Sequence, residues 1–138
     1  EALWIGEVNL GRRHHEVART MNNLGRLLRD LSRLDEAENH VSAALSIWQD
    51  LLGDAHPIYA RGQENLAFIL LMKGRSEQSL VIAKEALHKH ETALGPNHFW
   101  TKDSARTCAN AYLAAGHPGE SGALRIRYGL ELASVAAD

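Results

Sequence analysis

This sequence is poor in cysteine, proline and aromatic residues, and it has no long apolar run. Among its 138 residues Cys108 is the one cysteine, so no disulfide can form within the chain, which fits a reducing compartment such as the cytoplasm. No apolar stretch approaches the roughly 20 residues that a membrane-spanning helix needs. No segment alternates apolar and polar side chains in the way that half-buried strands do. We therefore expect an all-α, cytoplasmic protein with no membrane partner.

Neither sign of charge dominates the sequence. Fifteen Lys and Arg stand against 17 Asp and Glu, for a formal net charge of −2. The basic residues are interspersed with acidic ones and form no stripe with aromatic residues between them, so we expect no nucleic-acid partner. The first residues, Glu1 to Gly6, carry no basic lead of the kind that opens a signal peptide, and they indicate a fragment of a larger protein.

A short motif recurs at intervals of 42 residues. The pair Leu-Gly occurs at 10–11, 52–53 and 94–95, and a histidine follows each glycine three residues later, at 14, 56 and 98. A fixed period of this size is typical of stacked copies of one supersecondary unit. The period divides the chain into the end of a preceding repeat at 1–11 and three repeats at 12–53, 54–95 and 96–138, the last of them degenerate or capping.

Each repeat predicts two helices. The predicted first helices cover 15–31, 57–73 and 99–115, and the predicted second helices cover 35–52, 76–94 and 119–135. Pro57 suits the first turn of a helix, where its missing N–H is not needed. Asp35 and Glu38 resemble a capping box at the start of a second helix. His56, immediately before Pro57, is expected to hydrogen-bond the turn that starts its helix.

Eight positions of the first repeat resemble the consensus of the tetratricopeptide repeat. They are Met21, Leu24, Gly25, Leu28, Ala37, Val41, Ala44 and Leu45. The period of 42 and the Leu-Gly-x-x-His-Pro loop at 52–57 resemble the kinesin light chain subtype of that family. The resemblance covers nearly the whole chain and is weaker in the third repeat. It implies an all-α, α-solenoid superhelix of stacked antiparallel helix pairs, whose first helices line a concave groove.

One face of each first helix carries a polar stripe. At 100° per residue, Asn22, Asn23 and Arg26 lie within about 60° of Arg19, and the apolar residues cluster on the opposite side. The stripe recurs in the later repeats at the same period. The predicted peptide-binding residues are Arg19, Asn22, Asn23, Arg26, Arg61, Glu64, Asn65, Phe68, Arg106 and Asn110.

The chemistry of the stripe suits an extended peptide. An asparagine amide offers a donor and an acceptor that match those of a peptide bond, and an arginine can bind a carboxylate through two parallel hydrogen bonds. Phe68 and Met72 add an apolar patch for a ligand side chain. We therefore predict a mixed peptide motif with one acidic contact. The alternative is that the stripe is an ordinary solvated helix face.

The other chemically suggestive residues do not form a catalytic or metal site in this interpretation. The periodic histidines His14, His56 and His98 should lie roughly 20 Å apart, too far to share a zinc ion. Cys108 falls on the packing face of its helix beside Ala105, which indicates a buried apolar role rather than a nucleophile. We predict no metal, no cofactor and no enzymatic activity.

The sequence thus favours a protein–protein interaction module that binds a peptide or partner segment. Two alternatives remain at this stage. The repeats could form a structural arm that self-associates through exposed repeat ends. They could also be the sensor region of a larger signalling ATPase or protease.

Overall fold

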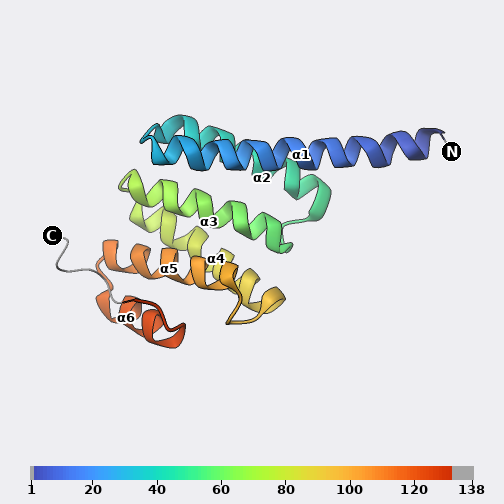
Figure 1. Cartoon of the computed structure of the whole chain (residues 1–138). Helices are drawn as coiled ribbons and strands as arrows, with labels where there is room; N and C mark the ends of the chain where they lie inside the picture. The colour runs from blue at the N-terminus through green and yellow to red at the C-terminus, as the bar shows by residue number, and fades with distance from the viewer. Residues whose placement is uncertain (1, 132–138) are drawn as a thin grey trace.

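The computed structural model describes residues 2–131, with their side chains from Leu10 onward. These residues form six α-helices and no strand: α1 (Ala2–Asp30), α2 (Leu34–Leu52), α3 (Pro57–Met72), α4 (Ser76–Leu94), α5 (Phe99–Ala114) and α6 (Pro118–Arg127). Successive helices pair as antiparallel hairpins that stack side by side (Figure 1). The predicted all-α solenoid is confirmed.

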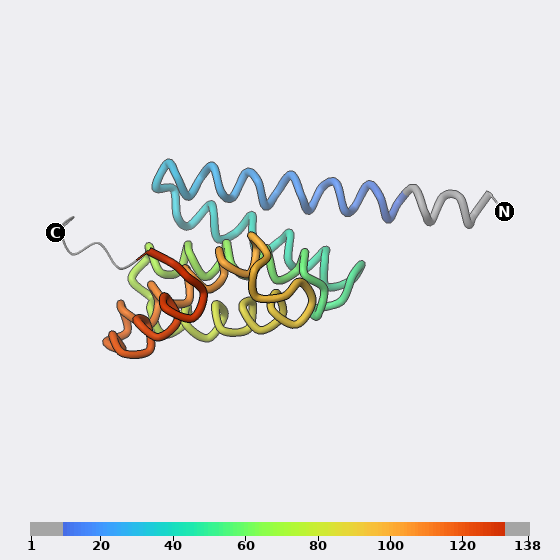
Figure 2. The backbone as a smooth tube through the Cα atoms, turned by 60° about the horizontal axis from the view of Figure 1, so that its bottom comes forward, coloured from blue at the N-terminus to red at the C-terminus, as the bar shows by residue number. Residues whose placement is uncertain are grey.

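The helices are arranged in two layers. Helix α3 packs against both α1 and α5, and α2 and α4 lie on the other side of this row. The tube in Figure 2 shows the same stack turned, with α1 along one edge of the molecule. The first helix of each hairpin therefore contributes to one shared surface. None of the described helices combines the length and apolar character that crossing a bilayer requires.

Four of the six helices agree with the sequence prediction. Helices α2 to α5 begin and end within one residue of the predicted bounds. The last helix, α6, ends at Arg127, and Gly129 follows it with a φ of 64°. The predicted extension to residue 131 is wrong, because Gly119 and Gly122 weaken this short helix; residues 132–135 lie outside the described part of the chain.

The first helix begins well before its predicted start at residue 15. Helix α1 runs without interruption from Ala2 to Asp30, through Gly11 and His14. A cartoon of the fold shows the N-terminal part of α1 extending past the end of the other helices (Figure 1). A glycine inside a helix costs only about 1 kcal/mol relative to alanine, so Gly11 does not by itself interrupt α1.

Histidine side chains cap the N-termini of two inner helices, α3 and α5. The Nδ1 atom of His56 accepts a hydrogen bond from the Ile58 N–H at 3.1 Å, which confirms its predicted role. His98 does the same for the Trp100 N–H at 3.0 Å.

The predicted capping box of Asp35 and Glu38 at the start of α2 is wrong, because no side chain caps this helix. Both carboxylates of that supposed box instead contact a lysine on another helix hairpin. Lys73 Nζ lies 2.6 Å from an Asp35 oxygen and 2.7 Å from a Glu38 oxygen. The residue before α2, Arg33, supplies no side-chain cap. The two acidic residues therefore join α2 to the end of α3.

Small side chains dominate the core and allow the helices to approach closely. A side chain at Gly25 would collide with Val41 of α2, so the α1–α2 contact requires a glycine there. Cys108 is 1% exposed, which confirms its predicted burial, and the apolar surroundings raise its pKa to about 11. The fully buried alanines are Ala18, Ala37, Ala44, Ala60, Ala67, Ala83, Ala86, Ala105, Ala109 and Ala111.

A buried polar contact recurs within the first two hairpins. Trp48 Nε1 donates to His15 Nδ1 at 3.1 Å between α2 and α1. One period later, His90 Nε2 lies 3.0 Å from the carbonyl oxygen of Pro57 between α4 and α3, and its Nδ1 lies 2.7 Å from Ser104 Oγ. The two aromatic positions are equivalent, so the hairpins keep one contact with different chemistry.

Candidate functional site: a groove along α1, α3 and α5

Two adjoining hollows lie along the inner row of helices. The smaller hollow, of about 160 Å³, is lined by Arg26, Arg29, Arg61, Glu64, Phe68, Asp103, Arg106, Thr107 and Asn110. The larger hollow, of about 490 Å³, is lined by His15, Arg19, Asn22, Asn23, Arg26, Trp48, Ile58, Arg61 and Trp100. Arg26 and Arg61 border both hollows, so we treat them as one groove.

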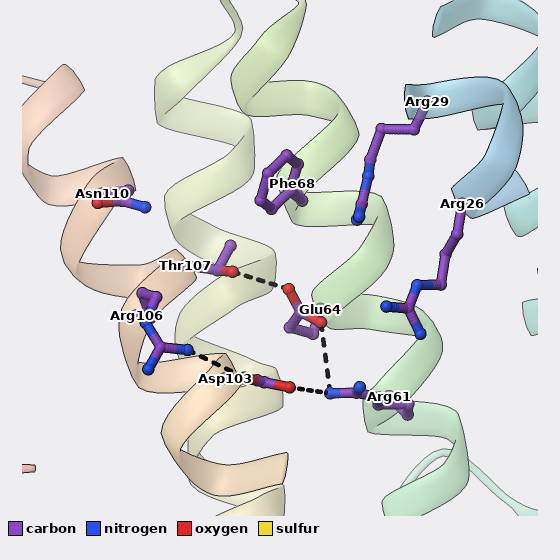
Figure 3. Close-up of a pocket in the computed structure, with 9 residues that line it drawn as sticks. All are labelled: Arg26, Arg29, Arg61, Glu64, Phe68, Asp103, Arg106, Thr107 and Asn110. Carbon is purple, nitrogen blue, oxygen red and sulfur yellow. Dashed lines mark hydrogen bonds and ion pairs between the residues drawn. The ribbon is translucent and has the colours of Figure 1, made fainter. Parts of the chain in front are cut away.

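The smaller hollow is rich in positive charge, with four arginines against two carboxylates. Asp103 lies between two of these arginines: its Oδ2 accepts from Arg61 Nη1 at 2.8 Å and its Oδ1 accepts from Arg106 Nη1 at 3.0 Å (Figure 3). These charge-assisted bonds fix the side chains on α3 and α5. The guanidinium groups are thereby held in place before any ligand arrives.

Glu64 is the second carboxylate of this hollow, and it is mostly enclosed. Its side chain is 12% exposed, its Oε2 accepts from Thr107 Oγ1 at 2.7 Å, and Arg61 Nη1 lies 3.7 Å from its Oε1 (Figure 3). Burial raises the pKa of Glu64, although Thr107 and Arg61 oppose the shift. The bond from Thr107 makes Glu64 a link between α3 and α5.

Two arginines reach the smaller hollow from α1. Arg29 Nη1 donates to Asn65 Oδ1 at 3.0 Å, and the Arg29 guanidinium lies 4.1 Å from the centre of the Phe68 ring, within cation–π range. Arg26 points toward the same hollow (Figure 3). It forms no hydrogen bond or ion pair with any described side chain, so its donors can bind a ligand anion.

The larger hollow combines an apolar surface with polar groups. Trp48, Ile58 and Trp100 provide the apolar part, and Asn23 and Arg19 lie along the same hollow on α1. This hollow has room for an apolar ligand side chain, with amide and guanidinium donors beside it.

Nine of the ten predicted binding residues line one or both hollows, and Asn65 does not. Asn65 is 2% exposed, and its Nδ2 donates to the Asn22 carbonyl oxygen at 3.3 Å and to Asn22 Oδ1 at 3.0 Å. The prediction of a ligand contact at Asn65 is therefore wrong, because this amide joins α3 to α1. Asn22 is itself 6% exposed, which leaves Asn23 as the exposed amide of the stripe.

Sequence reasoning missed several lining residues, notably Arg29. Arg29 stands one period before Leu71 and two periods before Leu113. A charged residue at a position that is leucine in the other two repeats could have indicated a functional role for Arg29. Trp100 also lines the larger hollow, although it is not among the predicted binding residues. Met72, predicted as part of the apolar patch, lines neither of these two hollows.

Hydrogen bonds hold the segment after α6 against the edge of the groove. Arg106 Nε donates to Glu131 Oε1 at 2.6 Å, and Arg125 Nη1 donates to the Glu131 carbonyl oxygen at 3.0 Å. Arg125 also donates to Asn110 Oδ1.

Among the described side chains, no group of three or more His, Cys, Asp or Glu gathers in a way that could hold a metal ion.

Stacked helix pairs with a groove along their inner row define a helical-repeat protein. In a comparison with known families, the family model described as Tetratricopeptide repeat matches residues 16–88, just over half of the chain. The chain belongs to the tetratricopeptide repeat family. Repeats of this family generally mediate interactions between proteins.

Proposed function

We propose that this chain binds an extended segment of a partner protein in the groove, by equilibrium binding and without catalysis. The observation that carries the proposal is that a cationic hollow and a partly apolar hollow adjoin and share Arg26 and Arg61. An acidic ligand residue would enter the smaller hollow, and a neighbouring apolar residue would enter the larger one. The 42-residue period and the histidine caps support membership of the kinesin light chain-like subtype. The single cysteine fits a cytoplasmic setting.

The arginines supply the main polar attraction in this proposal. Asp103 holds Arg61 and Arg106 at the edge of the hollow, but it also competes with a ligand carboxylate for their donors. Arg26 has its donors available for a bidentate contact. A short peptide with one such contact and one buried apolar side chain is expected to bind with micromolar affinity, about −8 kcal/mol.

An array of short peptides tests the ligand chemistry. Each peptide with an Asp or Glu beside an apolar residue would be paired with a version in which Asn or Gln replaces the acid. The labelled chain is expected to bind the acidic member of a pair more strongly, because only a carboxylate can accept paired bonds from an arginine. Equal binding to both members throughout the array would contradict the acidic contact.

The substitution Arg26→Ala then tests the groove itself. We expect a loss of about 1.5–3 kcal/mol in the binding of the strongest acidic peptide, measured by titration calorimetry, since a hydrogen bond to a charged group contributes this much. The matched control is Arg75→Ala, which removes an exposed arginine before α4, away from both hollows. A loss that is equal in the two variants would show a general charge effect and no groove contact.

A further inference from the structure

The Leu-Gly-x-x-His motif has two outcomes in this molecule. After α2 and α4, Gly53 and Gly95 end the helix with φ of 83° and 84°, and the histidine three residues later caps the next helix. In the first copy of the motif, Gly11 and His14 carry the same residue types but lie inside the continuous helix α1. The first copy therefore has the residue types that form a turn in the later copies, but here they lie within a helix.

The outer face of α1 is apolar and uncovered at the positions where α3 is covered. Val17, Leu24 and Leu27 are 41%, 39% and 55% exposed. One period later stand Tyr59, Leu66 and Ile69, which pack into the core cluster that contains Val41, Leu45 and Trp48 of α2. A shallow hollow of about 440 Å³ lies on this face of α1, lined by Arg13, Glu16, Val17, Thr20, Met21, Leu24 and His40.

The centre of the covered face on α3 is Gly62. A Cβ atom there would lie 2.7 Å from Leu45 Cδ2 and 3.2 Å from Trp48, so α2 rests directly on this residue. The equivalent residue of α1 is Thr20, which is exposed and lines the uncovered hollow. An α2-like helix placed in the same register would cover Thr20 and the apolar residues on either side of it.

The chain contains a segment with that sequence. Residues 2–11 align with residues 44–53, and five of these positions are identical: Ala2 with Ala44, Leu3 with Leu45, Ile5 with Ile47, Leu10 with Leu52 and Gly11 with Gly53. At the position of Trp48 the segment has Gly6, which leaves space for the Thr20 side chain where α3 has a glycine. The segment therefore resembles the half of α2 that rests on α3.

We propose that the outer face of α1 is a docking surface for the chain's own residues 2–10. The helix turns at Gly11, the segment folds back antiparallel over Val17, Thr20 and Leu24, and His14 caps the shortened α1 as His56 caps α3. The continuous helix and the folded-back form are two states of one chain. In the folded-back form the first repeat gains the neighbour that α3 has in α2, and the groove on the opposite side of α1 keeps its residues.

A disulfide between engineered cysteines distinguishes the two states. In a Cys108→Ala background, Leu3→Cys and Thr20→Cys replace the pair equivalent to Leu45 and Gly62. In the continuous helix these positions are about 25 Å apart, at 1.5 Å per residue, whereas in the folded-back form they meet at bonding distance. We expect an intramolecular disulfide, seen as a mass loss in the monomer. The control pair is Leu3→Cys with Arg19→Cys, which is equally distant along the helix but faces the groove, and it should form the bond about tenfold more slowly.

A third variant tests the hinge. Gly11→Ala fits the continuous helix, because an added Cβ meets nothing within 4 Å, but it disfavours the positive φ of the turn. We expect it to slow formation of the 3–20 disulfide by about fivefold. Equal rates for the two cysteine pairs, no disulfide at all, or a disulfide found only between two chains would overturn the proposal; the last result would assign the face to a second copy of the chain.

Discussion

The two junctions of the groove, α1 with α3 and α3 with α5, use one geometry with different chemistry. At the first junction Asn65 Nδ2 donates to Asn22 Oδ1 at 3.0 Å, and at the second Thr107 Oγ1 donates to Glu64 Oε2 at 2.7 Å. Both bonds join residues 43 positions apart. The repeat thus preserves a contact between the same two columns, while an amide pair at one junction becomes a hydroxyl and a carboxyl group at the other.

The junctions differ most in their charge. At the second junction Arg61 pairs with Asp103, which lies one period further along the chain. At the first junction the equivalent pair would be Arg19 and Arg61, and two positive charges cannot form it. Arg19 instead contacts the exposed Glu16 of its own helix at 3.3 Å. The first junction therefore keeps positive charge available to a ligand, and the second uses much of it to hold the helices together.

The largest expected effect comes from the buried amide of the first junction. Asn65→Ala would leave Asn22 Oδ1 and Arg29 Nη1 without their partner, and should lower the free energy of unfolding by about 1–3 kcal/mol in a urea titration. The control Asn39→Ala removes an exposed asparagine from α2 and should change stability little. If both variants were equally stable, the amide would not join the helices as described.

A smaller effect is expected from releasing the arginines of the second junction. Asp103→Asn removes the carboxylate between Arg61 and Arg106, so an acidic peptide should bind about fivefold more tightly in a calorimetric titration. Asp54→Asn, in the exposed loop before α3, has the same change in net charge and serves as the control. Weaker acidic-peptide binding by Asp103→Asn alone would mean that Asp103 orients the arginines more than it competes for them.

How much the sequence predicts depends on the kind of contact. The period locates the inner stripe, and nine of its ten proposed residues line the groove because equivalent positions lie on the same side of the stacked first helices. Helical angles do not reveal how close two helices come, and so they could not show that Asn65 is buried against Asn22 while Asn23, the equivalent residue one period earlier, is exposed. The motif at Gly11 matches its later copies, and nothing in its residues alone predicts the continuous α1.

The smallest expected effect is a pH dependence confined to the second junction. The folded-state pKa of Glu64 is raised above its ordinary 4.5, so its contribution to stability is full below that pH and is lost as the pH rises through the raised pKa. Glu64→Gln should remove this slope from urea titrations between acidic and neutral pH, and should raise stability at neutral pH by up to about 1 kcal/mol. An unchanged slope in Glu64→Gln would assign the pH dependence to another group.

The most direct test of groove binding is a map of amide chemical shifts. The isotope-labelled chain would be titrated with the strongest peptide from the array and, separately, with its Asn or Gln counterpart. The acidic peptide should shift the resonances around Arg26, Phe68 and Asn110 on the inner helices, and its neutral counterpart should shift them less at the same concentration. Shifts confined to α2 and α4 would contradict recognition of a partner segment by the groove.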